Sequence, residues 1–353
     1  MTRIAIDAMG GDNAPKAIVE GAVWAAMEYG IPIELVGKLY DIERELDRID
    51  QEGIVASIGG GLFKPKRIKV NTKALDIKKT QASEVIEMGE APGQAIRKKK
   101  NSSIVLAVNS VVTGSSDAVV AAGSTGAAMG ASLFGLGRLP GIERPAIATV
   151  IPTMKGPLVL IDSGANTDCT PQMLYQFGLM GSIYSKSVLG VENPRVALLN
   201  IGEEAGKGDE LAKDTYKLFE ENKGNINFIG NAEGKEIFLG NCDVIVCDGF
   251  VGNVTLKTIE GVARMLFYMI KQEFYHDLFS KLIGALVRPI LKRIYLKINY
   301  EEFGGAPLLG VKGVTIICHG RSSAYAIKNA VKVAYNAVEA GINKTIASYY
   351  GEK

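Results

Sequence analysis

Short apolar runs rich in valine and isoleucine alternate with longer segments of helical periodicity along almost the whole chain. Apolar runs bounded by glycine or polar residues predict strands, and apolar residues that recur every three to four positions predict helices. This alternation indicates an α/β fold with a mainly parallel sheet covered by helices on both faces. The predicted strands are residues 3–7, 33–37, 117–122, 146–151, 158–162, 195–201, 226–230, 243–247 and 314–318. The predicted helices are residues 17–29, 42–49, 103–113, 126–136, 171–188, 210–221, 255–275 and 323–340.

Two segments depart from this alternation. Residues 64–80 have little apolar periodicity, and we interpret them as an exposed loop or insertion. Residues 274–300 combine apolar positions every four residues with cations on the remaining face, which predicts an amphipathic projection that Pro289 divides into two helices. Such a projection either packs on protein or lies against lipid, and its excess of cations favours membrane contact together with a role in dimerisation. The residues expected at the membrane are Leu278, Leu282, Ile283, Leu286, Val287, Lys292 and Arg293.

The composition limits the classes of function. A chain of 353 residues with 47% hydrophobic residues and 41 glycines fits a compact α/β enzyme, and without a Pro/Ser-rich linker it is expected to form a single domain over residues 1–353. Four cysteines and two histidines show no metal-binding spacing and no signal peptide is evident, which favours a cytoplasmic protein without a metal site.

Charge adds one candidate surface. The formal net charge of +2 is too small to indicate nucleic acid binding. Cations nevertheless gather in residues 64–79 and in the run Arg97, Lys98, Lys99 and Lys100. Each cluster is either a solvated face or a docking surface for an acidic partner.

Glycine and polar residues collect at the carboxyl ends of the predicted strands. In open α/β sheets ligands bind in the crevice beyond those ends, so six such turns are expected to line one cleft. The turns are residues 7–12, 122–126, 162–166, 200–204, 230–233 and 248–249.

The most informative turn is Asp248-Gly-Phe-Val-Gly-Asn-Val-Thr-Leu-Lys257, which joins an apolar strand to a helix. Such turns direct backbone N–H groups and the positive end of a helix dipole at an anion. We therefore expect Gly249, Gly252 and Asn253 to contact phosphate. Because the chain repeats the arrangement several times, the pattern indicates an active site for a phosphate-bearing or phosphate-like reactant.

Two further glycine turns are candidates for the same site. In the first turn of the chain, Asp7, Gly10 and Gly11 either approach a ligand closely or only cap the next helix. Ser124, Thr125 and Gly126 have the same two interpretations, an oxyanion cradle or helix capping.

The remaining candidates are also open to two interpretations. Asp162 and Asn166 flank another glycine turn that is either a binding or a capping turn, and Lys207 either neutralises phosphate or lies in a mobile surface loop. His319 follows the last predicted strand, where it could act as an acid or a hydrogen-bond donor, whereas His276 is not expected to take part in chemistry.

Taken in order, these segments resemble the motifs of the bacterial phosphate acyltransferase family, and the resemblance covers nearly the whole chain. The matching motifs are Ile4-Ala-Ile-Asp-Ala-Met-Gly-Gly-Asp12, Ala82-Ser-Glu-Val-Ile-Glu-Met88, Arg97-Lys-Lys-Lys-Asn-Ser-Ser103, Gly123-Ser-Thr-Gly-Ala127, Asp162-Ser-Gly-Ala-Asn166, Asn227-Phe-Ile-Gly-Asn231, residues 248–257, Gly304-Gly-Ala-Pro-Leu-Leu-Gly310 and His319-Gly-Arg-Ser322. Asn13 and Ser124 depart from the family pattern, which usually has histidine and asparagine there.

The resemblance implies a three-layer α/β/α fold related to phosphotransacetylase and isocitrate-dehydrogenase-like enzymes. It implies a homodimer, peripherally associated with the inner face of the cell membrane, that transfers a fatty acyl group from acyl carrier protein to inorganic phosphate without a cofactor. The acyl phosphate would pass to a membrane glycerol-3-phosphate acyltransferase at the start of phospholipid synthesis.

For this reaction the enzyme must hold phosphate against a thioester and stabilise the tetrahedral oxyanion. Lys257 or Lys207 is expected to supply positive charge, and His319 could protonate the leaving thiolate, although a thiolate leaves readily without an acid. Asn166, Asn231 and Asp248 are expected to position these groups. Two alternatives remain open, an NAD-dependent dehydrogenase on a related fold and a non-catalytic membrane scaffold.

Overall fold

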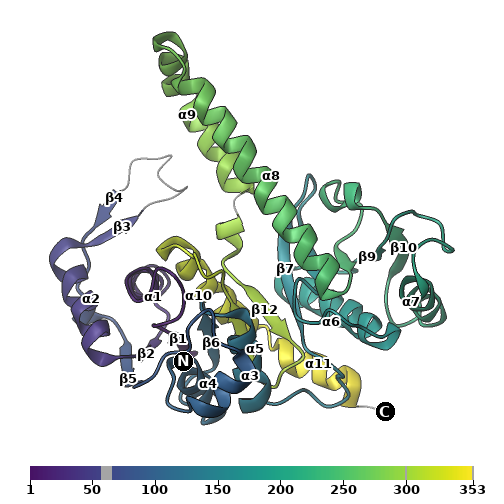
Figure 1. Ribbon diagram of the computed structural model, residues 1–353, viewed down its shortest axis with the longest axis horizontal. Coiled ribbons are helices and arrows are strands. Elements are labelled where there is room, and N and C mark those ends of the chain that lie inside the picture. The colour runs from purple at the N-terminus through teal and green to yellow at the C-terminus, as the bar shows by residue number, and fades with distance from the viewer. Residues whose placement is uncertain (57–65, 299, 352–353) are drawn as a thin grey trace.

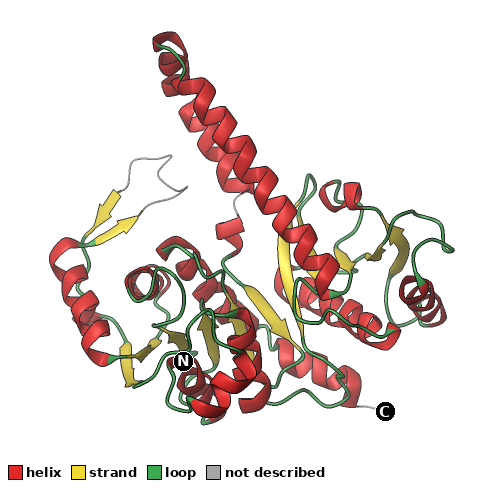
Figure 2. Cartoon of the chain, in the orientation of Figure 1, coloured by secondary structure: helices red, strands yellow, loops and turns green. Residues whose placement is uncertain are grey.

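The computed structural model describes residues 1–56, 66–298 and 300–351, and its centre is one eleven-stranded sheet (Figures 1 and 2). All nine predicted strands are present, which confirms the α/β class. Across the sheet the strands are β10 (Phe228–Ala232), β9 (Val196–Leu199), β11 (Val244–Val246), β8 (Pro157–Ile161), β7 (Ala146–Pro152), β12 (Ala306–Leu309), β13 (Val314–Ile317), β6 (Ala118–Ala121), β1 (Ile4–Asp7), β2 (Ile33–Gly37) and β5 (Ile77–Gln81).

The sheet consists of two parallel halves that run in opposite directions. Strands β13, β6, β1, β2 and β5 are mutually parallel, and so are β8, β11, β9 and β10. Between them β12 is antiparallel to both β13 and β7, and β7 is antiparallel to β8. The carboxyl ends of the two halves therefore lie at opposite edges of the sheet, so the six glycine turns that were expected to line one cleft do not share one edge.

Successive side chains of each strand point to opposite faces of the sheet, and helices cover both faces. This gives the three-layer α/β/α architecture. One face forms a single continuous core. On the other face the core is divided into two clusters, one under α3, α4 and α5 and one under α8 and η2 (Gly234–Phe238). The helices of the first face are α1 (Lys16–Tyr29), α2 (Leu39–Glu52), α6 (Pro171–Leu189), α7 (Glu210–Glu221), α10 (Ala324–Glu339) and α11 (Ile342–Gly351). Those of the second face are α3 (Pro92–Lys98), α4 (Ser103–Val112), α5 (Thr125–Gly135) and α8 (Gly249–Tyr275).

The interpretation of residues 64–80 as an exposed loop is wrong for the two described stretches that form strands. Residues 66–68 form β4, which pairs with β3 (Ile54–Ala56), and residues 77–81 form β5 at the edge of the main sheet. The buried Glu34 carboxylate of β2 accepts hydrogen bonds from Thr80 of β5 and from Ser116. An ion pair with Lys78 adds to them, so polar contacts rather than an apolar run hold this edge strand.

Helix α8 and the following α9 (Leu278–Ile298) form an antiparallel hairpin that projects far from the sheet (Figure 1). The prediction that Pro289 divides this segment is wrong, because α9 continues through Pro289 and the chain turns at His276 and Asp277. The two helices approach closely at Gly284, where a Cβ would lie 3.0 Å from the Phe274 ring. The projection is thus longer than residues 274–300, because the outer half of α8 belongs to it.

Candidate active site

A cleft of about 680 Å³ lies on the second face of the sheet, between the two clusters into which that core is divided. Its floor includes Ile147 and Thr149 of β7 and Ile317 of β13. The turns after β6, β13 and β8 form its walls together with one face of α8 and residues 304–306. The cleft therefore spans the boundary between the two halves of the sheet, and turns from opposite edges reach it from two sides.

On one side of the cleft the turns after β1, β6 and β13 pack together. A Cβ at Gly10 would lie 2.7 Å from the Asp7 carboxylate and 2.9 Å from the Gly123 nitrogen, so this contact requires glycine. The Asp12 amide donates to the Gly320 carbonyl at 2.8 Å. Asp7 is 4% exposed, and burial raises its pKa. Asp7, Gly10 and Gly11 support the neighbouring turns, and in this turn the residue that lines the cleft is Asp12.

The turn after β6 presents a helix N-terminus to the cleft. Gly123 and Thr125 line the cleft, and α5 begins at Thr125. The Ser124 hydroxyl accepts from the Ala127 amide, as a helix cap does. The amides of Thr125 and Gly126 belong to the first turn of the helix, where N–H groups have no acceptor within the helix. This turn can therefore offer N–H groups to an anion.

On the other side, the turns after β8 and β11 use their polar groups internally. Asp162 is fully buried and accepts hydrogen bonds from the amides of Ile147, Gly164, Ala165 and Asn166 and from the Asn166 side chain. Burial raises the pKa of Asp162, against the effect of those hydrogen bonds. Asp162 and Asn166 thus fix the turn, and the residues that line the cleft here are their neighbours Ser163 and Gly164.

The expectation that the amides of residues 249–252 contact phosphate is wrong. The Gly249 amide donates to the Asn166 carbonyl, and the Gly252 amide donates to the Asp248 carbonyl. The amides of Phe250 and Val251 donate to the Asp248 carboxylate, which caps α8. Because all four amides have partners within the protein, this turn contributes to the cleft through the side chains that follow it.

Those side chains lie on one face of α8. Asn253, Lys257, Glu260 and Arg264 follow one another at intervals of three or four residues, and all line the cleft. The Lys257 ammonium lies 3.0 Å from the Glu260 carboxylate. Lys257 and Asn253 were predicted from the sequence, whereas Glu260 and Arg264 were missed, although the helical spacing from Lys257 marks them.

His319, at the end of β13, faces the same side chains. Its Nδ1 accepts from the Arg321 amide at 3.1 Å, so in the neutral ring Nε2 carries the proton. Burial lowers the pKa of His319, and the positive charges of Lys257, Arg321 and Arg264 lower it further, against the opposing effect of Glu260. The geometry favours a neutral imidazole that donates a hydrogen bond over an imidazolium acid.

Other predicted residues lie outside this cleft. Lys207 and Asn231 meet near the outer end of the sheet, where the Asn231 amide donates to the Glu204 carbonyl and Lys207 donates its N–H to the same carbonyl. In the basic run Lys99 is tied to the Val85 carbonyl and to Glu90, while Arg97 lies over the Phe134 ring. Arg97, Lys98 and Lys100 remain exposed at the end of α3, which leaves them accessible to a partner.

Comparisons with known proteins agree with this architecture. Residues 65–345 match a family model described as fatty acid synthesis protein. The phosphate acyltransferase of Halothermothrix orenii is 49% identical over 341 residues, with 96% of each chain covered. That of Heliobacterium modesticaldum is 51% identical over 337 residues, which is 96% of this chain and 94% of the relative.

Solved structures show the same fold at much lower identity. A phosphotransacetylase from Streptococcus pyogenes superimposes with a TM-score of 0.59 at 16% identity, over 96% of this chain and 94% of its own. A phosphotransacetylase from Staphylococcus aureus superimposes with a TM-score of 0.57 at 14% identity, again over 96% of this chain and 94% of its own. Because the sequence relatives match at about half of all positions over nearly their full length, the chain belongs to the phosphate acyltransferase family of transferases.

Proposed function

We propose that this protein transfers a fatty acyl group from the thioester of acyl carrier protein to inorganic phosphate, forming an acyl phosphate for phospholipid synthesis. The observation that carries the proposal is the cleft itself, which combines the N-terminus of α5 at Thr125 with the cations Lys257, Arg264 and Arg321. Within the cleft these three cations exceed the two carboxylates, Asp12 and Glu260, which suits a phosphate anion.

In the proposed reaction a phosphate oxygen attacks the thioester carbonyl, and the resulting tetrahedral oxyanion collapses with cleavage of the carbon–sulfur bond. Phosphate dianion is already nucleophilic, so the protein needs to hold it near the carbonyl and to stabilise the oxyanion. We assign phosphate to the Thr125 and Gly126 amides and the Lys257 ammonium. Asn253, one turn before Lys257 on the same face of α8, is assigned to orient the reacting groups.

His319 takes the role of a hydrogen-bond donor in this scheme. A neutral ring whose Nδ1 is occupied offers Nε2–H to an oxyanion or to the departing sulfur. A thiolate is a good leaving group, so a hydrogen bond suffices and full proton transfer from an imidazolium is not required. Three residues are assigned an indirect, positioning role. The turns that carry Asn253, Ser163 and Gly164 are fixed by hydrogen bonds of Asp248, Asp162 and Asn166.

The carrier protein is proposed to dock on the exposed cations Arg97, Lys98 and Lys100, at the end of α3. This helix packs against α5, whose first turn lines the cleft, so a partner held there would lie beside the site. An acidic carrier is the kind of partner that such a cluster attracts.

The α8–α9 hairpin is proposed to contact the membrane surface and a second copy of the chain. Near its tip Leu278, Phe279 and Leu286 are 78%, 73% and 80% exposed, and Leu282 is 63% exposed. Lys292 and Arg293 add positive charge to α9. Among the described helices, none has both the length and the apolar character needed to cross a bilayer. Peripheral contact at the inner face of the cell membrane would let the acyl phosphate pass to a glycerol-3-phosphate acyltransferase.

The test is phosphate-dependent release of free thiol from acyl carrier protein, with acyl phosphate measured as the second product. Equal amounts of both, absent without inorganic phosphate, are expected. Thiol release that does not depend on phosphate would contradict the proposal. A tight, saturable NAD titration without any acyl transfer would favour the dehydrogenase alternative, and inactivity in both assays would leave a scaffold role.

A further inference from the structure

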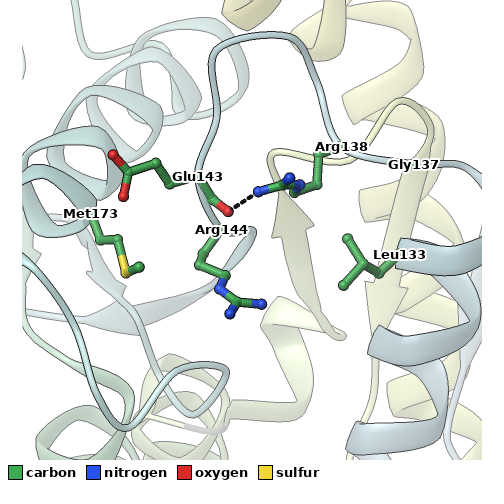
Figure 3. Close-up of a pocket in the computed structure, with 6 residues that line it drawn as sticks. All are labelled: Leu133, Gly137, Arg138, Glu143, Arg144 and Met173. Carbon is green, nitrogen blue, oxygen red and sulfur yellow. Dashed lines mark hydrogen bonds between the residues drawn. The ribbon is translucent and has the colours of Figure 1, made fainter. Parts of the chain in front are cut away.

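A second cavity, of about 630 Å³, lies beyond the far end of α5 from the cleft (Figure 3). The loop that joins α5 to β7 forms one wall, and the first turn of α6 forms the opposite wall. Leu133 and Met173 supply apolar surface on two sides. The lining residues are Leu133, Gly137, Arg138, Glu143, Arg144 and Met173.

The cavity carries an excess of positive charge. Arg138 donates a hydrogen bond to the Glu143 backbone carbonyl, which fixes its guanidinium at the rim. In the part of the chain that the structure describes, no residue forms a hydrogen bond or ion pair with the Arg144 guanidinium, which lies between Leu133 and Met173 in Figure 3. The Glu143 carboxylate points away from both guanidinium groups. The Lys312 side chain adds a third cation beside Gly137.

The cavity and the cleft share structural elements. Thr125 lines the cleft and Leu133 lines the cavity, eight residues further along α5, which is a rise of about 12 Å. Arg144 precedes Ile147 of the cleft floor by three residues, or about 10 Å of extended chain. The Asn166 side chain also donates to the Pro145 carbonyl, which ties this loop to the turn that carries Ser163 and Gly164.

We infer that this cavity binds the phosphate group of the donor's phosphopantetheine arm, an inference that rests on the proposed acyl transfer. Such an arm has its thioester at one end and its phosphodiester at the other, separated by a long flexible chain. With the thioester carbonyl in the cleft, the phosphodiester lies at some distance from it, and a guanidinium without a protein partner is the group that recognises phosphate best. The reacting inorganic phosphate stays in the cleft, so the two anions occupy different sites.

The test compares two thioester donors that differ only in this phosphate, acyl-phosphopantetheine and acyl-pantetheine. In Arg144→Ala, kcat/KM for the phosphorylated donor is expected to fall roughly 10- to 100-fold, because the variant loses one or two charge-assisted hydrogen bonds to the phosphate. The value for acyl-pantetheine and the KM for inorganic phosphate should stay unchanged. Arg44→Ala is the control, since Arg44 is an exposed arginine of α2 that lines neither the cavity nor the cleft.

Three results would overturn the inference. Equal losses of kcat/KM with both donors would point to a structural effect of the substitution. A change confined to the KM for inorganic phosphate would assign the cavity to the acceptor. Equal kcat/KM of the wild-type enzyme for the two donors would show that the cavity does not bind the donor's phosphate. Should Arg144→Ala fail to fold, calorimetry with the wild-type chain compares the affinities for phosphopantetheine and pantetheine. Equal affinities would contradict the inference. Failure of the proposed function is distinct, because then neither donor would yield acyl phosphate.

Discussion

The Lys257 ammonium lies 3.0 Å from the Glu260 carboxylate, one turn further along α8, and both side chains face the cleft. The carboxylate partly neutralises the cation that is assigned to phosphate, so the two substitutions should act in opposite directions. Lys257→Ala is expected to raise the KM for phosphate roughly tenfold and to lower kcat, whereas Glu260→Gln should lower that KM by a few-fold. Initial rates over a range of phosphate concentrations measure both effects.

A control for this pair lies on the same helix. Lys271 is exposed on the outer part of α8, and Lys271→Ala should leave the KM for phosphate unchanged. If Lys257→Ala kept wild-type kinetics, Lys257 would have no part in the site, and Arg264 and Arg321 would remain as its cations.

The ring of His319 is expected to titrate below its ordinary pKa of 6.5, and Lys257 is one of the causes. Removal of that positive charge in Lys257→Ala should raise the pKa of His319 toward 6.5. Removal of the Glu260 charge in Glu260→Gln should lower it, since Glu260 favours the imidazolium. The protonated fraction at a given acidic pH therefore rises in the first variant and falls in the second.

Proton NMR can follow this titration directly, because the chain has only two histidines and His276→Gln assigns the other resonance. The chemical shift reports His319 alone, free of the ionisation of phosphate that complicates a rate profile. A His319 pKa above 6.5 in the wild-type chain would contradict a neutral imidazole and favour the acid, which is one of the two roles that the sequence left open for His319.

Two glycines of α8 should respond oppositely to alanine. A Cβ at Gly252 would lie 1.9 Å from the Asp162 carbonyl oxygen, so Gly252→Ala must push apart the turns after β8 and β11 and is expected to cost roughly 3 kcal/mol of unfolding free energy. At Gly261 the added Cβ would have no described atom within 4 Å apart from its own stretch of helix, so Gly261→Ala should stabilise the helix by about 0.5–1 kcal/mol. Urea unfolding of both variants measures the difference, and equal effects would contradict the close contact at Gly252.

The buried strands could be predicted because their apolar runs are unambiguous, but which strands pair, and in which direction, could not. The β12 strand was missed because it has a proline and follows two glycines, so its sequence resembles a turn. It is antiparallel to both β13 and β7, which leaves those two strands running in the same direction. The direction of the sheet reverses at the antiparallel pair of β7 and β8, and this pairing places the turns of the two halves at opposite edges.

The candidate site, like the sheet, could be predicted from the sequence only in part. Thr125, Asn253, Lys257 and His319 could be found from strand ends and helix starts, and all four line one cleft. The Asp248 cap could not be distinguished from an anion-binding turn, since both need the same residues, and its carboxylate takes the amides that an anion would use. Glu260 and Arg264 were missed because charges on an amphipathic helix usually face solvent.

The missed edge strand β5 leads to a prediction about acid stability. Burial alone would raise the pKa of Glu34, but hydrogen bonds from Thr80, Ser116 and Lys78 outweigh it and lower the pKa from 4.5 to about 2. A carboxyl with a lowered pKa in the folded state contributes stability above the unfolded pKa, and that contribution is lost as the pH falls toward the folded value. Glu34→Gln should therefore be less stable than wild type by about 2–3 kcal/mol at neutral pH.

The difference between the two proteins should shrink as the pH falls from 4.5 to about 2, because only the wild-type chain loses the Glu34 contribution there. Urea unfolding at a series of pH values measures this difference directly, and other carboxyl groups cancel because both proteins carry them. Glu43→Gln is a suitable control, since its exposed ion pair with Lys79 joins α2 to the same strand β5 and should contribute little. A difference that stays constant down to the lowest pH would show that Glu34 does not hold β5 through its charge.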